Sequence, residues 1–280
     1  MNFEKDTIKH LVLDFVRSER ELSPRLGGYK LYLMVKAHFK DDFTMGRDAF
    51  YSLLDQYNLK LRQKKRTIRT TDSNHNYPKY NNIIKDLKPI MSNQIWVSDI
   101  TYIRTEKGFC YLSLITDLYS RRIMSWVLAP RLKFSYTEQA LRNAIQEANT
   151  DLRGLIHHSD RGFQYCYTSY TNILKDNGIR ISMTETSDPK DNAVAERVNG
   201  ILKQEWLNHM EFKDINEAEE VIREKITYYN ERRLHSSINY LTPNQAHNLK
   251  GDLPRRWYSS KKRYIEKLKA RKEDNTIKYL

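Results

Sequence analysis

Cysteine, glycine-rich loops and long apolar runs are scarce in this 280-residue chain, and each scarcity excludes a class of protein. Two cysteines, Cys110 and Cys166, cannot form a disulfide framework or a Cys-x-x-Cys zinc site, and we expect buried or idle thiols in a reducing cytosol. No run of about 18 apolar residues occurs, so we expect no membrane-spanning helix. The first residues show no secretory pattern, so we expect a protein that is not exported. The chain also lacks a glycine-rich phosphate-binding motif, which argues against nucleotide hydrolysis.

Positive charge is what the chain has in excess, with a net charge of +13. Residues 1–91 carry +7, residues 92–249 carry −1 and residues 250–280 carry +7. Two basic arms therefore flank a nearly neutral centre, which is the distribution expected of a protein that binds a polyanion such as DNA.

Residues 1–60 show the period of three short amphipathic helices, over 4–18, 29–39 and about 45–57. Three helices with a turn before the last one are typical of a helix-turn-helix DNA-binding domain. Residues 61–91 follow as a basic arm and linker. In that arm we expect four side chains to contact phosphates: Lys64, Lys65, Arg66 and Arg69.

Residues 92–249 have the pattern of an α/β domain with a mixed sheet. Three strands at 95–103, 109–118 and 122–129 are separated by short turns, which favours an antiparallel meander. Ser135 and Glu138 have capping-box spacing at the start of a helix. The remaining pattern predicts strands near 155–158 and 179–183, helices near 167–177 and 215–229, Gly178 as a C′ residue, and Thr242-Pro243 as the start of a last short helix.

Three carboxylates far apart in the chain are the candidate catalytic centre. Asp99 interrupts an otherwise apolar strand face, which is costly unless the carboxylate is paired or binds a metal. Asp160 ends a short strand, and 35 residues separate it from Glu196. Glu196 shares one helical stripe with Asn192, Asn199 and Lys203. Hard oxygen ligands of this kind suit Mg²⁺ or Mn²⁺, and two such ions about 3.5–4 Å apart promote phosphoryl displacement.

Other groups compete for roles in this centre. Glu185, Asp188 and Asp191 are alternatives to Glu196, although Asp188 or Asp191 also suits a helix cap. Asp117 is either a fourth ligand or, more simply, a turn residue. The adjacent histidines His157 and His158 are either ligands or a general base, or else packing residues at the end of a strand, because two-metal catalysis needs no histidine.

The motifs around these carboxylates resemble a known family. Trp96-Val-Ser-Asp99-Ile-Thr-Tyr, His158-Ser-Asp160-Arg-Gly and Asp191-Asn-Ala-Val-Ala-Glu196 are similar to the DDE motif of insertion-sequence transposases of the IS-three group, which are related to retroviral integrases. The 35-residue gap and Lys203, seven residues after Glu196, match as well. The segment from Tyr229-Asn-Glu-Arg-Arg-Leu-His235 to Thr242-Pro243 resembles the end of the core in these proteins. The resemblance covers about residues 20–250.

The resemblance implies a ribonuclease H-like core and a catalytic subunit encoded by the second reading frame of a mobile element. It implies that Asp99, Asp160 and Glu196 bind two Mg²⁺ or Mn²⁺ ions and catalyse DNA cleavage and strand transfer, and that Lys203 contacts DNA near the element end. We also expect contacts to DNA from five further residues of the core: Asn199, Arg161, Arg232, Arg233 and His235.

Two departures from related proteins bear on the partners. The module that the first reading frame supplies, and the zinc-binding His/Cys domain of retroviral integrases, have no counterpart in this sequence. We therefore expect double-stranded DNA as the substrate, a homo-oligomer on that DNA, and a separate or fused first-frame partner. The expected location is the bacterial cytoplasm, at the nucleoid.

Two other functions are compatible with the same residues. One is a structure-specific nuclease of the same fold that cuts but never joins, and the other is a DNA-binding regulator with a relic core. The basic tail, residues 250–280, contains Trp257 and Tyr258, which either stack on nucleobases or belong to a solvated segment that orders on DNA.

Overall fold

The computed structural model describes residues 3–61, 78–185 and 191–254. Its helices are α1 (Phe3–Leu22), α2 (Gly28–Phe39), α3 (Arg47–Gln56), α4 (Phe134–Ala148), α5 (Phe163–Cys166), α6 (Thr168–Asp176), α7 (Ala193–Glu205), α8 (Ile215–Glu231) and α9 (Pro243–His247). Short 3₁₀ turns are η1 (Lys40–Asp42), η2 (Leu207–His209) and η3 (Ser236–Ile238). The strands are β1 (Ile95–Thr105), β2 (Gly108–Asp117), β3 (Ile123–Ala129), β4 (Ile156–Ser159) and β5 (Arg180–Met183).

The five strands form one mixed sheet in the order β3-β2-β1-β4-β5. The first three strands pair antiparallel, and β4 and β5 continue the sheet from β1 in parallel pairings. The predicted meander and mixed α/β fold are thereby confirmed. Parallel strands need a crossover connection, and α4 supplies it between β3 and β4.

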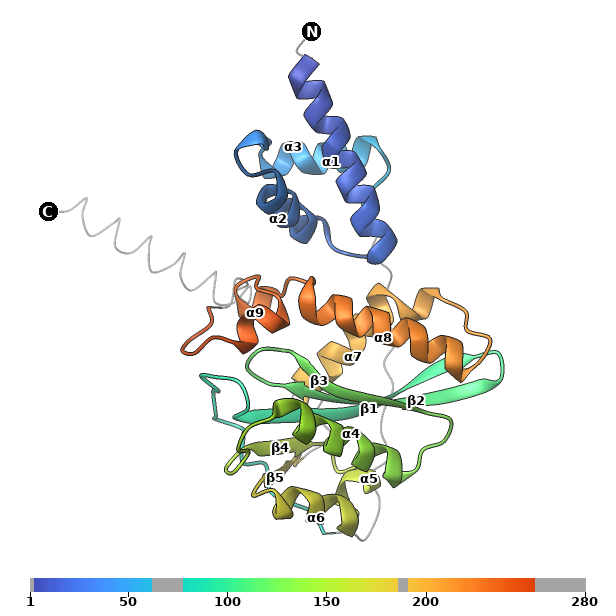
Figure 1. The fold of residues 1–280 in the computed structure, drawn as a ribbon, viewed down its shortest axis with the longest axis vertical. Coiled ribbons are helices and arrows are strands. Elements are labelled where there is room, and N and C mark those ends of the chain that lie inside the picture. Colours follow the sequence, from blue (N-terminus) through green and yellow to red (C-terminus); the bar gives the residue numbers. More distant parts are fainter. Residues whose placement is uncertain (1–2, 62–77, 186–190, 255–280) are drawn as a thin grey trace, which may run out of the picture.

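Helices cover both faces of the sheet (Figure 1). On one face, α7 and α8 pack apolar side chains such as Val198, Ile201 and Ile222 against the meander. On the other face, α4, α5 and α6 enclose a second core around Trp96 and Leu141. Burial of apolar surface in two layers fixes the strands firmly, so side chains that leave β1 and β4 have well-defined positions.

Helices α1, α2 and α3 form a separate three-helix bundle with its own apolar core, around residues such as Val12, Leu31 and Phe50. All three predicted helices are present, with ends shifted by a few residues. In Figure 1 the bundle lies over α8, on the α7–α8 side of the sheet. Trp206 helps to join the two parts, because its indole N–H donates to the carbonyl of Leu22 at 3.0 Å.

Three local predictions meet different outcomes. Thr242 and Pro243 begin α9 as expected, with a capping box completed by Gln245. Gly178 follows α6 at φ +65°, the left-handed conformation that favours glycine. The capping box at Ser135 is wrong, because α4 already begins at Phe134 and Glu138 instead accepts a hydrogen bond from Ser169.

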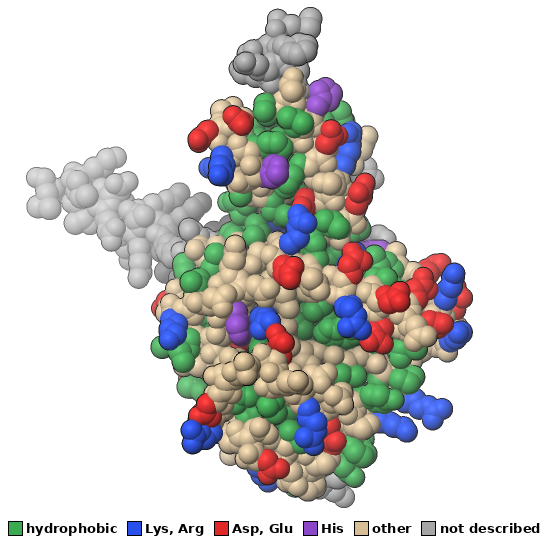
Figure 2. Space-filling model, viewed as in Figure 1, with side chains coloured by type: hydrophobic (Ala, Val, Ile, Leu, Met, Phe, Trp, Pro, Cys, Tyr) green, Lys and Arg blue, Asp and Glu red, His purple; other side chains and the backbone are tan. Residues whose placement is uncertain are grey.

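The described residues hold little of the excess positive charge. Residues 62–77 carry +4 and residues 255–280 carry +7, and both segments lie outside the described part. In the view of Figure 2, acidic and basic side chains are intermixed over the bundle and the core. Within the described part, no helix combines the length and the apolarity that crossing a membrane requires.

Candidate functional site

Asp99 and Asp160 are brought together by the pairing of two parallel strands. Strands β1 and β4 pair through Ile95 with Ile156 and through Val97 with His158. Continuing that register by two residues places Asp99 opposite Asp160, one residue beyond the end of β4. Neighbouring strands lie about 4.8 Å apart, so the two aspartates leave the sheet side by side.

Asp99 is held by two hydrogen bonds. Its Oδ2 accepts from the Asn199 side-chain amide at 2.7 Å, and its Oδ1 accepts from the backbone N–H of Ile100 at 2.9 Å. Burial and the nearby carboxylate of Asp160 raise the pKa of Asp99 to about 7; Glu196 adds to the rise, while the two hydrogen bonds oppose it. The charges of Asp160 and Glu196, from distant parts of the chain, thus both act on Asp99.

Asp160 is held by the tight turn that follows it. Its Oδ1 accepts from the backbone N–H of Gly162 at 3.0 Å. A Cβ atom at position 162 would lie 2.9 Å from the same oxygen, closer than a methyl group and an oxygen can approach. Gly162 therefore leaves the space that the Asp160 carboxylate occupies.

Glu196 lies in the first turn of α7, and its side chain is exposed. The stripe predicted for this helix is only partly a surface. Asn199 is 5% exposed and faces Asp99, while the N-cap residue Asn192 is 6% exposed and donates to the carbonyl of Ser98 at 3.0 Å. The buried residues Asn192 and Asn199 fix α7 to β1, while the Glu196 side chain is exposed at the edge of the site.

The donor set at this place fits a divalent cation. Within residues 3–61, 78–185 and 191–254, no three acidic, histidine or cysteine side chains are already gathered as a metal site. Three carboxylates repel one another, and a cation would offset that repulsion. Two buried polar atoms, the Tyr165 hydroxyl and Asn199 Oδ1, have no hydrogen-bond partner among the described residues, and the water carried by a hydrated metal ion would satisfy both.

Tyr165 was not singled out by the sequence pattern. It lies in α5, a four-residue helix too short to show a period, and it is 3% exposed. Burial raises the pKa of its hydroxyl well above the usual value, and the neighbouring groups Tyr170, Asp160 and Asp99 contribute to the rise. The hydroxyl therefore stays neutral, and the charges of both aspartates act on it.

The two histidines of β4 have interior hydrogen bonds. His157 Nε2 lies 2.7 Å from Ser98 Oγ and 2.9 Å from the Tyr170 hydroxyl, and His158 lies within 3.0 Å of Ser182 Oγ and the Asp191 carbonyl. Burial lowers the pKa of His157 to about 3 and that of His158 to about 4. Both rings are therefore neutral near pH 7 and support the sheet, which agrees with the packing interpretation.

The competing acidic residues have other surroundings. Asp117 accepts from the N–H and hydroxyl of Ser120 and from the N–H of Asn93, as a turn residue does. Glu185 accepts from the N–H of Asn82 at 3.3 Å. Asp188 lies outside the described residues, and the N-cap of α7 is Asn192 rather than Asp191.

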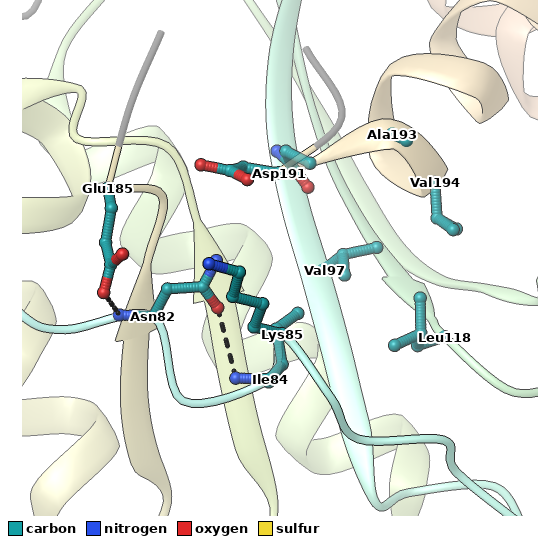
Figure 3. Close-up of a pocket in the computed structure, with 10 residues that line it drawn as sticks. Asn82, Ile84, Lys85, Val97, Leu118, Glu185, Asp191, Ala193 and Val194 are labelled. Carbon is teal, nitrogen blue, oxygen red and sulfur yellow. Dashed lines mark hydrogen bonds between the residues drawn. The ribbon is translucent and has the colours of Figure 1, made fainter. Parts of the chain in front are cut away.

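A cavity of about 540 Å³ lies beside the N-terminal end of α7. Figure 3 shows Asn82, Lys85 and Glu185 on one side of it and Asp191, Ala193 and Val194 on the other. Val97 also lines it, two residues before Asp99 on β1, but Asp99, Asp160 and Glu196 are absent from its described wall. The cavity therefore adjoins the carboxylate site without containing it.

The predicted DNA contacts have different surroundings in the structure. Arg233, His235 and Asn199 lie in the interior of the described structure: Arg233 donates two hydrogen bonds of 2.7 and 2.6 Å to Glu205, His235 packs against Tyr229, and Asn199 donates to Asp99. Arg232 pairs with Glu19, and Arg161 donates to the Glu185 carbonyl at 3.2 Å. Lys203 lies 4.0 Å above the Tyr102 ring.

The four residues of the basic arm, Lys64, Lys65, Arg66 and Arg69, lie outside the described residues.

Comparison with known proteins gives this geometry a family. Two models described as integrase core domain match residues 90–189 and 177–243. A 31 kDa protein of insertion element IS600 from Shigella sonnei is 38% identical over 206 residues, which are 73% of this chain and 75% of that protein. Transposases of IS629 from Shigella sonnei and of IS904 from Lactococcus lactis are 32% and 34% identical. The IS629 alignment covers 66% of this chain and 62% of that transposase, and the IS904 alignment covers 58% of this chain and 63% of that transposase.

A solved structure supports the fold. The chain is 17% identical to a chain in the intasome structure of simian T-cell lymphotropic virus, with a TM-score of 0.50 over 85% of this chain and 76% of that one. At this identity the likeness bears on the fold alone. Sequence relatives, the integrase core match and the mixed sheet lead to one assignment: the chain belongs to the IS-three family of insertion-sequence DDE transposases, which are related to the retroviral integrases.

Proposed function

We propose that this transposase cleaves DNA strands at the ends of its insertion sequence and joins them to target DNA, with Asp99, Asp160 and Glu196 as the catalytic carboxylates. The supporting observations are the pairing of β1 with β4, whose register sets Asp99 opposite Asp160, and the pKa of Asp99, which burial raises and the carboxylates of Asp160 and Glu196 raise further. The domain limits proposed for this activity are residues 1–60 for DNA reading, 61–91 for the arm and linker, 92–249 for catalysis and 250–280 for the basic tail.

The proposed cofactor is Mg²⁺ or Mn²⁺, with two ions held by the three carboxylates. When bound, such ions activate a hydroxyl nucleophile and stabilise the leaving oxygen of an in-line displacement. Asn199 holds the Asp99 carboxylate in one orientation, and Gly162 does the same for Asp160. A fixed orientation limits the reorganisation needed when substrate and metal bind.

The proposed substrate is double-stranded DNA, bound by a homo-oligomer with or without a first-frame partner, at the nucleoid. Lys203, Arg161 and Arg232 are the described residues that we retain as DNA contacts, together with the basic arm. Their cationic groups would contribute salt-dependent affinity for phosphates. Arg232 would have to exchange Glu19 for DNA, because it is paired in the described structure.

The assignment is tested with Asp160→Asn, which keeps the size of the side chain and removes its charge. We expect Mg²⁺-dependent joining to be lost while DNA binding persists, and Asp176→Asn, an exposed aspartate at the end of α6, is the matched control. Full joining activity in Asp160→Asn would refute the assignment. A strand-transfer assay on pre-cut ends separates a transposase from a nuclease, which yields no joined product, and metal-dependent cleavage excludes a relic core.

A further inference from the structure

The β1–β2 hairpin extends beyond the carboxylate site. Strand β4 pairs with β1 only over Ile95–Val97, whereas β2 pairs with β1 as far as Thr105. The part of β1 that follows Asp99 therefore has β2 on one side and no neighbouring strand of the described sheet on the other. Residues alternate along β1, so Tyr102 lies on the sheet face opposite Asp99, and the open edge of β1 lies between the two faces.

Two aromatic side chains are exposed on this projecting part. Tyr102 is 37% exposed and Phe109 is 52% exposed. They come from opposite strands of the hairpin, and their rings meet edge to face with centroids 5.4 Å apart. An edge-to-face pair holds both rings in a fixed geometry, and together they present an apolar surface to solvent.

A cation from α7 lies over one ring of this pair, that of Tyr102. Lys203 Nζ is 4.0 Å from the centroid of the Tyr102 ring, at the distance of a cation–π interaction. Lys203 is seven residues after Glu196 on α7, and Tyr102 is three residues after Asp99 on β1. The two elements that carry catalytic carboxylates therefore meet again at the aromatic pair.

The distance from the carboxylates to the aromatic pair is similar along α7 and along β1. Seven residues of helix rise about 10 Å, and three residues of strand also advance about 10 Å. Stacked DNA advances about 3.4 Å per nucleotide along its axis. About three stacked nucleotides cover this distance along β1. An extended strand of the same length reaches farther, which allows it to pass round the open edge of β1 from the carboxylates to the aromatic pair.

We propose that Tyr102 and Phe109 form a stacking platform for an unpaired nucleobase within three nucleotides of the scissile phosphate, and that Lys203 binds the intervening phosphate. The proposal rests on the proposed function, which supplies the DNA. Its chemistry is that of single-strand binding proteins, in which aromatic faces stack on bases and a basic side chain follows the backbone. The combination would favour an element end that opens locally over one that stays fully paired.

The test uses a duplex with four unpaired nucleotides at one 3′ end, with 2-aminopurine placed in turn at each of them, in Ca²⁺ to avoid turnover. Stacking on the platform is expected to quench 2-aminopurine at one or two adjacent positions. Phe109→Leu keeps apolar bulk and removes the aromatic face, so we expect about a tenfold loss of affinity and loss of the quench. Phe109→Trp should restore both.

The salt dependence of DNA affinity distinguishes the phosphate contact of Lys203 from base stacking on Tyr102 and Phe109. Lys203→Gln should lower the slope of log affinity against log salt by about 0.7–0.9, because one phosphate contact is lost. Phe109→Leu and Tyr102→Leu should leave this slope unchanged. Leu132→Ala, which removes an exposed apolar side chain from another loop, is the control for a general loss of apolar surface.

Three outcomes would overturn the platform. The first is unchanged 2-aminopurine quenching in both leucine variants, and the second is a loss of quenching and affinity in Phe109→Leu that is also seen in Phe109→Trp. The third is a change in the oligomeric state of the leucine variants in sedimentation without DNA, which would identify a protein interface instead. Strand joining by the wild-type protein is measured in parallel. If joining persists and the quench is absent, the platform alone is wrong, whereas absent metal-dependent joining would overturn the proposed function.

Discussion

The amide Nδ2 of Asn199 donates a 2.7 Å hydrogen bond to Oδ2 of Asp99, joining helix α7 to strand β1 across 100 positions of sequence. This bond lies at the centre of the site. It orients one carboxylate and ties it to the helix that carries another. Because the bond stabilises the ionised form of Asp99, it also opposes the rise in pKa that burial and Asp160 cause.

Asn199→Ala should therefore weaken the site without unfolding the core. Loss of the amide removes one restraint on Asp99 and raises its pKa further. We expect a 10- to 100-fold loss of Mg²⁺-dependent joining and weaker binding of Mn²⁺ by titration calorimetry, the range typical of groups that orient metal ligands. Asn143→Ala, on the opposite face at α4, is the control. Unchanged Mn²⁺ affinity in Asn199→Ala would show that the bond has no orienting role.

Gly162→Ala should act on Asp160 in a similar way. The new methyl group would lie 2.9 Å from Asp160 Oδ1, so the carboxylate must move away from the N–H that holds it. The backbone at 162 has φ −60°, which alanine adopts freely, so the effect comes from this contact rather than from backbone strain. We expect at least a tenfold loss of joining with less than about 2 kcal/mol lost in the free energy of unfolding.

The control for that substitution is Gly200→Ala in the middle of α7, where, among the described residues, a Cβ atom would meet only Gln204 at 3.9 Å. Replacing glycine inside a helix should stabilise the protein by up to about 1 kcal/mol and leave joining intact. Joining in Gly162→Ala that equals joining in Gly200→Ala would contradict the packing argument.

The main elements of the core could be predicted because each has a clear period. The alternation of residues 95–103 gave β1 and the position of Asp99, and the helical stripe gave α7 and Glu196. Helix α5 has only four residues and shows no period, so Tyr165 was missed. The capping-box pattern at Ser135 failed because Glu138 has a tertiary partner, Ser169, which sequence spacing cannot reveal.

Contacts between the bundle and the core were also invisible in the sequence. Arg232, Arg233 and His235 form a basic segment that suggests DNA binding when it is read alone. In the structure, Arg233 is buried against Glu205 and Arg232 binds Glu19 of α1. Glu19 is 2% exposed and also accepts from the Tyr228 hydroxyl at 2.9 Å. These arginines stabilise the fold through partners that lie 28 and 213 positions away in the sequence. The period of apolar residues along the chain carries no information about such distant partners.

Tyr165→Phe should have opposite effects on stability and on metal binding. The hydroxyl is buried and has no hydrogen-bond partner in the described part of the chain, so its removal should leave the free energy of unfolding unchanged or slightly higher. Mn²⁺ affinity should fall, by about tenfold if the hydroxyl donates to metal-bound water. Tyr170→Phe is the informative comparison, because it removes a satisfied bond to His157 and should cost about 1 kcal/mol of stability with little change in Mn²⁺ affinity. The same response in both variants would contradict this assignment of the two hydroxyls.

Lys30 should make the docking of the three-helix bundle sensitive to pH. Its Nζ lies 3.6 Å from Glu205 Oε1, but Arg233 already binds that carboxylate with two shorter bonds. Burial, together with the nearby Arg233 charge, lowers the pKa of Lys30 to about 7. The unfolded chain keeps the Lys30 proton up to about pH 10.5, whereas the folded protein releases it above about pH 7.

Because the unfolded state binds more protons in that interval, the free energy of unfolding gains from Lys30 as the pH rises from 7 towards 10.5. We expect a gain of about 2 kcal/mol between pH 7.5 and 9.5 in the wild type, relative to Lys30→Met, measured by urea denaturation. Lys36→Met, in the same helix, controls for the loss of a lysine charge and should keep the wild-type pH dependence. A parallel pH dependence in the wild type and Lys30→Met would show that Lys30 stays protonated at the interface, and that Glu205 can neutralise two buried cations at once.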